Sequence, residues 1–77
     1  MMKEILEVIA KALVDQPEGV SVSESETDHS ITLELRVADG DMGKVIGKQG
    51  RIAKAIRTVM KSAAVKTGKR VSVDIVQ

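Results

Sequence analysis

The stretch GKVIGKQGR, residues 43–51, decides how the middle of this chain folds. It places Gly47 and Gly50 on either side of Lys48 and Gln49. Because each glycine costs a helix about 1 kcal/mol relative to alanine, the pair disfavours one continuous helix. Glycine also lets a ligand or another backbone approach closely. The stretch therefore predicts a tight turn between two helices, with backbone exposed to a binding partner.

The segments that flank this turn have helical patterns. Asp39 and Asp41 can cap a short helix that begins near Met42 and ends before Gly47. A longer helix follows Gly50 and ends near Gly68, a natural C-cap. Its predicted core stripe consists of Ile52, Ala55, Ile56, Val59 and Ala63. Its predicted solvent face carries Arg51, Lys54, Arg57 and Lys61.

The remaining segments predict one more helix and three strands. Apolar residues at helical spacing indicate a helix over about residues 2–14. Alternating patterns indicate strands over 20–26 and 31–37, joined as an antiparallel hairpin, with 20–26 at a sheet edge. A third strand covers 70–76. The order α-β-β-α-α-β predicts a two-layer α+β fold, with a three-stranded sheet covered by helices on one face.

Length and composition limit the kinds of function to be expected. Residues 1–77 suffice for one domain, and a chain of this size buries only about 60% of its unfolded surface. The sequence contains no Cys, which excludes disulfides and cysteine redox chemistry. It contains no Phe, Tyr or Trp, so the core must be aliphatic. No nucleophile–base pair or metal-binding cluster is visible, so we expect neither an enzyme nor a cofactor.

The charges are strongly segregated although their sum is only +1. Residues 42–73 contain nine basic residues and no acidic residue, and all eleven carboxylates lie elsewhere. A surface of one sign concentrates the electrostatic field that a polyanion requires. A solvated basic helix face is the alternative interpretation. Arg57, Lys61, Lys66 and Lys69, which lie far from the turn, are expected to be solvated surface.

The start of the longer helix is a candidate anion site. Its free N–H groups and positive dipole end favour an anion, and Lys44, Lys48 and Arg51 add charge. A Walker A loop is excluded, because only three residues separate Gly43 from the next glycine and no Ser or Thr follows the lysine. The dinucleotide fingerprint G-x-G-x-x-G is absent as well.

The residues Val45-Ile46-Gly47-Lys48-Gln49-Gly50-Arg51, between two helices, resemble the I-G-x-x-G signature of KH domains. The element order resembles the type II, bacterial form over the whole chain. In that family the GXXG loop clamps the backbone of about four nucleotides of single-stranded RNA. The resemblance implies RNA contacts from Lys44, Ile46, Gly47, Lys48, Gln49, Gly50, Arg51, Ala53 and Lys54. Ile46, with Ala53 behind it, is the expected groove floor; many family members have isoleucine where this chain has Ala53.

The resemblance also implies partners and a cellular role. It implies single-stranded RNA as ligand, pairing as a homodimer or with a larger KH-containing protein, and a part in post-transcriptional regulation or RNA chaperoning. The sequence itself does not identify the pairing surface; the exposed face of the edge strand and one side of the first helix are two candidates. The alternative is a protein-interaction module whose basic face is incidental. Charged residues in the N-terminal helix argue against a signal peptide or membrane span, so a cytoplasmic location is expected.

Two features of the 20–30 region have simpler interpretations. His29 is expected to be an exposed turn residue, because no second histidine or cysteine accompanies it. Glu24, Glu26 and Asp28 are expected to form an acidic edge that discourages strand pairing or keeps RNA on the opposite side.

Overall fold

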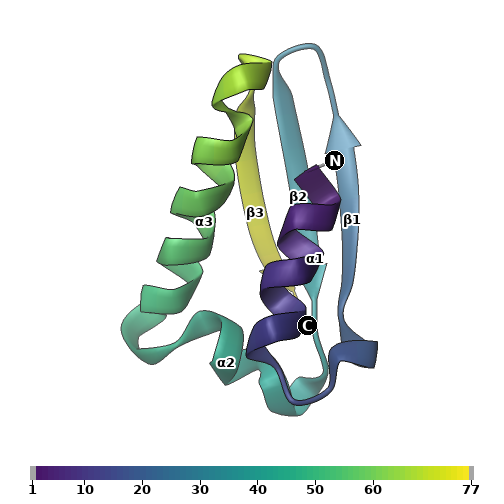
Figure 1. Ribbon diagram of the computed structural model, residues 1–77, viewed down its shortest axis with the longest axis vertical. Coiled ribbons are helices and arrows are strands. Elements are labelled where there is room, and N and C mark those ends of the chain that lie inside the picture. Colours follow the sequence, from purple (N-terminus) through teal and green to yellow (C-terminus); the bar gives the residue numbers. More distant parts are fainter. Residues whose placement is uncertain (1, 77) are drawn as a thin grey trace.

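The computed structural model describes residues 2–76; Met1 and Gln77, which the predicted domain included, lie outside the described residues. Three α-helices and three strands occur within that range (Figure 1): α1 (Met2–Leu13), β1 (Ser21–Glu26), β2 (Ser30–Arg36), α2 (Met42–Ile46), α3 (Arg51–Ala64) and β3 (Arg70–Val76). This order confirms the predicted α+β fold. None of the helices between residues 2 and 76 is long and apolar enough to cross a membrane.

The sheet is mixed, and its strand order is β1-β2-β3. β1 and β2 form the predicted antiparallel hairpin, in which Glu24 lies opposite Leu33. β3 runs parallel to β2, with Val73 opposite Leu33. Parallel pairing follows from the connection through α2 and α3, which returns the chain to the end where β2 began. β1 and β3 are therefore the two edges of the sheet, as predicted for β1.

The core lies between one face of the sheet and the helices. Leu33 and Leu35 of β2 are fully buried against Leu6 of α1 and Met60 of α3. Figure 1 shows α1 in front of β1 and β2, with α3 alongside β3. The opposite face of the sheet carries polar residues, among them the adjacent Ser23, Glu34 and Asp74, all exposed.

The buried face of α3 differs from the predicted stripe. Ala55 and Val59 are exposed, and the fully covered positions are Ala53, Ile56, Met60 and Ala64. The helix packs against β3 as well as α1, so its buried face points between the two. Ile56 belongs to both sets, but Ala53, Met60 and Ala64 are buried in place of the predicted Ile52, Val59 and Ala63. Ala55 and Val59 are left on the flank beside α1.

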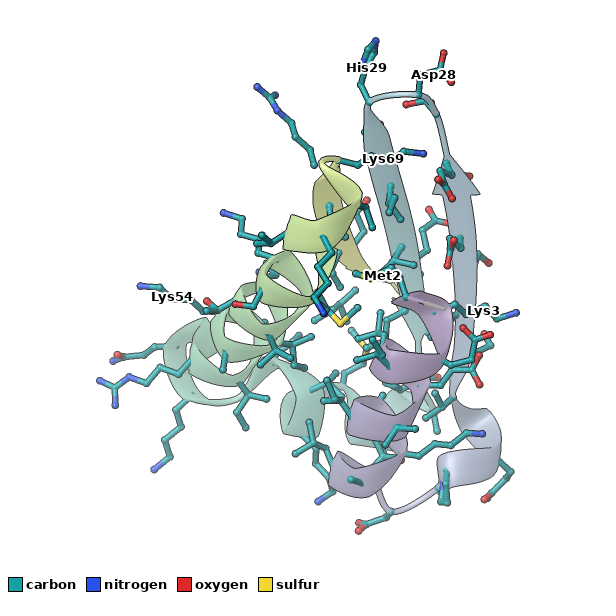
Figure 2. The ribbon with its side chains drawn as sticks, turned by 45° about the horizontal axis from the view of Figure 1, so that its top comes forward. Met2, Lys3, Asp28, His29, Lys54 and Lys69 are labelled. Carbon is teal, nitrogen blue, oxygen red and sulfur yellow. The ribbon has the colours of Figure 1, made fainter. Side chains whose placement is uncertain are left out.

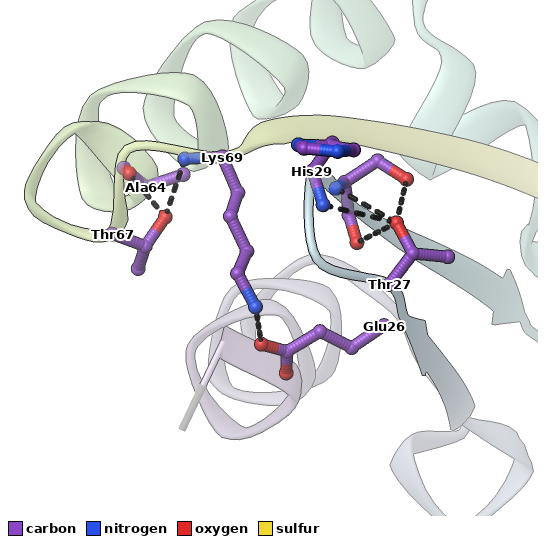
Figure 3. Close-up of polar contacts among 7 residues, drawn as sticks. Glu26, Thr27, His29, Ala64, Thr67 and Lys69 are labelled. Atoms are coloured by element: carbon purple, nitrogen blue, oxygen red, sulfur yellow. Dashed lines mark hydrogen bonds and ion pairs between the residues drawn. The ribbon is translucent and has the colours of Figure 1, made fainter.

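The tip of the β1–β2 hairpin is organised by one threonine. The Thr27 Oγ1 accepts hydrogen bonds from the backbone N–H of His29 (3.2 Å) and of Ser30 (3.0 Å) (Figure 3). His29 is an exposed turn residue, as predicted, and projects from the end of the hairpin (Figure 2). The prediction for Lys69 was wrong: its ammonium pairs with the Glu26 carboxylate, and only 23% of its side chain is exposed.

Glu24 also has an internal role that the sequence did not reveal. Its Oε1 accepts a hydrogen bond from the backbone N–H of Lys3 at 3.1 Å. That N–H belongs to the first turn of α1, where no helical carbonyl can receive it. Glu24 on β1 therefore acts as a cap for α1, while Asp28 remains exposed at the hairpin tip (Figure 2).

Candidate nucleic-acid interface

The four residues between α2 and α3 form the predicted tight turn. The N–H of Gly47 donates to the Gly43 carbonyl at 2.8 Å and closes α2. Three of the four residues have positive φ: Gly47 (74°), Gln49 (57°) and Gly50 (73°). Gln49 has a Cβ and therefore adopts the left-handed conformation at a cost of about 1–2 kcal/mol. The chain reverses here in the smallest space that two glycines permit.

The two glycines serve different purposes. A Cβ on Gly47 would lie 2.6 to 2.9 Å from side-chain atoms of Ile52, far inside normal contact distance. A Cβ on Gly50 would meet no atom within 4 Å. Gly47 is thus required by packing within the protein, whereas Gly50 is required only by its positive φ. The space beside Gly50 is open to an approaching ligand.

Three basic side chains near this turn are not neutralised by the protein. Lys48, Arg51 and Lys54 are exposed, and among residues 2–76 no ion pair or hydrogen bond engages their side chains. No side chain caps the N-terminus of α3, so the positive end of its dipole adds to these charges. Figure 2 shows Lys54 extending from α3 away from α1. The arrangement favours an anion at the turn.

The predicted cap of α2 has another function. Asp41 is buried, and its side chain makes no cap hydrogen bond to α2. Its carboxylate instead accepts hydrogen bonds from the backbone N–H of Asp15 (3.2 Å) and of Gln16 (3.0 Å). The backbone N–H groups just beyond α1 need acceptors, because buried polar groups are almost always hydrogen-bonded. The Asp41 carboxylate accepts from two of them, whereas a cap of α2 would engage one. Asp41 thereby fixes the start of α2 to the end of α1.

Lys44 forms an ion pair with an acidic side chain. Its Nζ lies 3.4 Å from Oδ2 of Asp15, and the Asp15 side chain is 79% exposed. An exposed pair of this kind contributes at most about 1 kcal/mol. Lys44 can therefore exchange Asp15 for an external anion at little cost.

A hollow of about 390 Å³ extends this surface along α3 to the edge strand β3. One wall consists of side chains from α3: Lys54, Arg57, Thr58 and Lys61. The other wall is the β3 segment 71–74. Lys54, a residue predicted from the sequence, joins the hollow to the basic surface at the turn.

Arg57 and Lys61 were predicted to be solvated surface, and both are exposed. Both line the hollow, and Arg57 is fixed there because its Nε donates to the Val73 carbonyl at 3.1 Å. The β3 wall was missed entirely. The spacing of Lys54, Arg57 and Lys61 places them on one helix face. This spacing was the signal in the sequence that could have predicted a basic wall.

The two residues predicted to form a groove floor lie outside this hollow. Ile46 is 37% exposed at the end of α2, and Ala53 is 4% exposed within the protein. Neither lines the space between α3 and β3.

A second, apolar groove of about 450 Å³ lies on the other flank of α3, against α1. Its walls are Ile9 and Leu13 from α1, and Ile52, Ala55, Ile56 and Val59 from α3, with Arg51 at one end. Helical spacing puts Ala55 and Val59 on the side of the buried stripe opposite to Lys54 and Lys61. The apolar residues of α3 that were predicted to be buried but are exposed, Ala55 and Val59, therefore belong to one continuous apolar surface.

Comparison with known proteins identifies the family. The model of the KhpA/KhpB KH domain matches residues 3–75. The chain belongs to the KhpA/KhpB family of KH domains. It is 68% identical over 75 residues to the RNA-binding protein KhpA of Clostridium acetobutylicum, covering 97% of this chain and 100% of that protein. KhpA of Listeria monocytogenes is 49% identical over 76 residues, covering 99% of this chain and 100% of the relative.

KhpA of Aquifex aeolicus, at 47% identity over 76 residues, extends the likeness to a more divergent relative and covers 99% of this chain and 96% of that protein. Among solved structures, Era in complex with MgGDPNP and nucleotides 1506–1542 of 16S ribosomal RNA matches with a TM-score of 0.69. The identity is 20%, and the match covers 96% of this chain but 28% of Era, so it demonstrates a shared fold. The predicted resemblance to KH domains is confirmed.

Proposed function

We propose that this KhpA-family protein binds single-stranded RNA across the turn and the adjoining hollow. The observation that carries the proposal is the row of unpaired basic side chains that runs from Lys48 through Lys54 into a hollow beside an open strand edge. Its closely similar relatives bear the name RNA-binding protein. The turn and the cations of α3 receive the sugar-phosphate backbone, and the β3 side of the hollow receives bases.

The two walls of the hollow contact different parts of the RNA. Cations on α3 face the phosphates, and Arg57 already has its geometry fixed by the Val73 carbonyl. Aliphatic groups such as Val71, with Ile46 beside the turn, contact base faces. Base stacking on aromatic rings does not contribute, because the sequence has none. Binding through a single such site is expected to be weak and to cover about four nucleotides.

The same proposal includes Lys44, Gly47, Gln49, Gly50, Arg51 and Ala53, the other residues predicted from the sequence. Gly50 and the free N–H groups nearby lie where a phosphate can approach, while Gly47 and Ala53 support the turn from inside. The protein acts by holding RNA, without catalysis. This activity suits post-transcriptional regulation or RNA chaperoning.

Pairing with a second KH domain would compensate for weak single-site binding, because joining two sites raises the effective concentration of the second. We place this pairing at the apolar groove between α1 and α3, through a second copy of the chain or the KH domain of a KhpB-like protein. Val59 is 48% exposed at the centre of this surface, and burying it removes apolar area from water. The RNA hollow on the opposite flank remains accessible in the pair.

The test of RNA binding is fluorescence anisotropy with a short labelled single-stranded RNA. The variant Lys48→Asp with Gln49→Asp places negative charge where phosphate is proposed and changes neither glycine. The matched control, Lys3→Asp with Ser21→Asp, introduces the same charge change on exposed residues away from the turn. Circular dichroism first establishes that all three proteins are folded.

We expect the turn variant to lose binding at least tenfold relative to the control variant, because two carboxylates replace the charge at the phosphate site. Equal binding by the two variants would show that the turn is only a structural joint. A protein that forms pairs in solution and ignores RNA would support the interaction-module alternative.

A further inference from the structure

Arg57 differs from the other cations that line the hollow between α3 and β3. Its Nε donates to the carbonyl oxygen of Val73 at 3.1 Å, so its guanidinium lies against the edge strand β3. Lys54 and Lys61 line the same hollow, but among residues 2–76 neither ammonium has a hydrogen bond or ion pair. Arg57 therefore starts on the wall proposed for phosphate and ends on the side proposed for bases.

The contact with Val73 fixes one part of the guanidinium and leaves the rest available. An arginine side chain has N–H donors in a planar fork and no acceptor. Within the described range 2–76, the bond from Nε is the one hydrogen bond of the Arg57 side chain. Its two Nη groups therefore keep their donors for a ligand. Because Arg57 is exposed and lines the hollow, a bound base can reach them.

The same contact engages an acceptor that the strand edge would otherwise offer. The edge of a sheet presents free backbone C=O and N–H groups. The Val73 carbonyl could accept from the amino group of a base, but it already accepts from Arg57. At this level the hollow thus suits a base edge that carries acceptors. Guanine has two adjacent acceptors, O6 and N7, which match the paired donors of arginine, whereas adenine has an amino group in place of O6.

We propose that Arg57 is a specificity-determining residue that favours guanine over adenine in the hollow, through contacts of its Nη groups with O6 and N7. The inference rests on the proposed RNA binding and names the base that the site prefers. The next turn of α3 supplies a matched control. Lys61 lines the same hollow, is exposed and carries the same charge, but it has no hydrogen bond to β3.

The experiment measures anisotropy with a labelled adenosine tetramer and with the four tetramers in which guanosine replaces one adenosine. The proteins are the native chain, Arg57→Lys, which keeps the charge but loses the planar fork, and Lys61→Gln, which loses a charge. Circular dichroism first establishes that all are folded. The informative quantity is the ratio of the Kd for the adenosine tetramer to the Kd for the tightest guanosine-containing tetramer. A sixth RNA carries 7-deazaguanosine, which lacks N7, at that position and tests the contact without altering the protein.

We expect a ratio of about five for the native chain, the low end of discrimination by a bidentate contact. Lys61→Gln should weaken binding to every tetramer and keep this ratio, because it removes a charge that faces phosphate. Arg57→Lys, and 7-deazaguanosine with the native chain, should each bring the ratio close to one. A native chain without preference, an unchanged ratio in either of these two cases, or an equal loss in Lys61→Gln overturns the role of Arg57 and leaves RNA binding intact. Failure of the native chain to bind any tetramer overturns both proposals.

Discussion

Replacement of Gly47 by alanine should destabilise the protein far more than the same replacement at Gly50, although both residues belong to one turn. Gly47 has φ 74° and ψ 179°, a region that essentially only glycine occupies, at a cost of about 1–3 kcal/mol for other residues. Its new Cβ would also lie 2.6 Å from Ile52 Cγ1, and overpacking of this kind costs about 1–3 kcal/mol.

The expected loss of unfolding free energy for Gly47→Ala is therefore about 4 kcal/mol, the middle of the combined range. Gly50→Ala adopts an ordinary left-handed conformation with no atom within 4 Å of the new Cβ, so its expected loss is about 1 kcal/mol. A chain of 77 residues has a total stability of about 4–12 kcal/mol. Gly47→Ala removes a large part of it.

Urea denaturation followed by circular dichroism measures both losses, since the chain has no aromatic residue for fluorescence. With a slope of about 1 kcal/mol per molar urea, the midpoint should fall by about 4 M for Gly47→Ala and about 1 M for Gly50→Ala. Gly47→Ala should cost less in an Ile52→Ala background than in the native chain, because two of the three clashing atoms are then absent. Equal losses at the two glycines, or the same cost of Gly47→Ala in both backgrounds, would refute the packing argument.

Three further results are expected. Asp41→Ala should lower the unfolding free energy by about 2 kcal/mol, because two backbone N–H groups lose their acceptor, whereas the exposed Asp39→Ala should change it little; equal effects in urea titrations would contradict this. Val59→Asp should reduce self-association measured by light scattering, whereas Val65→Asp, 75% exposed outside the groove, should not. The slope of log binding constant against log salt concentration should be near −2 for about three neutralised phosphates, and a flat slope would exclude the phosphate clamp.

The sequence was sufficient to predict the element order, the hairpin, the edge position of β1 and the turn around Gly47. These features depend on local signals: alternation, helical spacing and glycine conformation. The exposed face of α3 was harder to predict. Ala55 and Ala53 have the same side chain, and the packing of α3 against β3, α1 and α2 decides which of them is buried.

Contacts between distant segments account for the other differences. Asp41 was read as a local cap, but its partners lie 25 and 26 residues away in the chain. The Arg57 contact with Val73 spans 16 residues, and the Lys69 contact with Glu26 spans 43. Side-chain type alone does not encode such pairings. They arise only when the sheet brings the strand ends and helices together.

The helix α3 has three working surfaces: the core stripe, the basic wall of the hollow and the apolar wall of the groove. Few of its 14 residues lie outside these three surfaces. A random substitution in this helix is therefore expected to harm at least one of folding, the proposed RNA binding or the proposed pairing. The open face of the sheet, where exposed Ser23 and Glu34 lie side by side, has none of these three roles. Tolerance to amino-acid change should thus be concentrated on the side of the molecule that faces away from its helices.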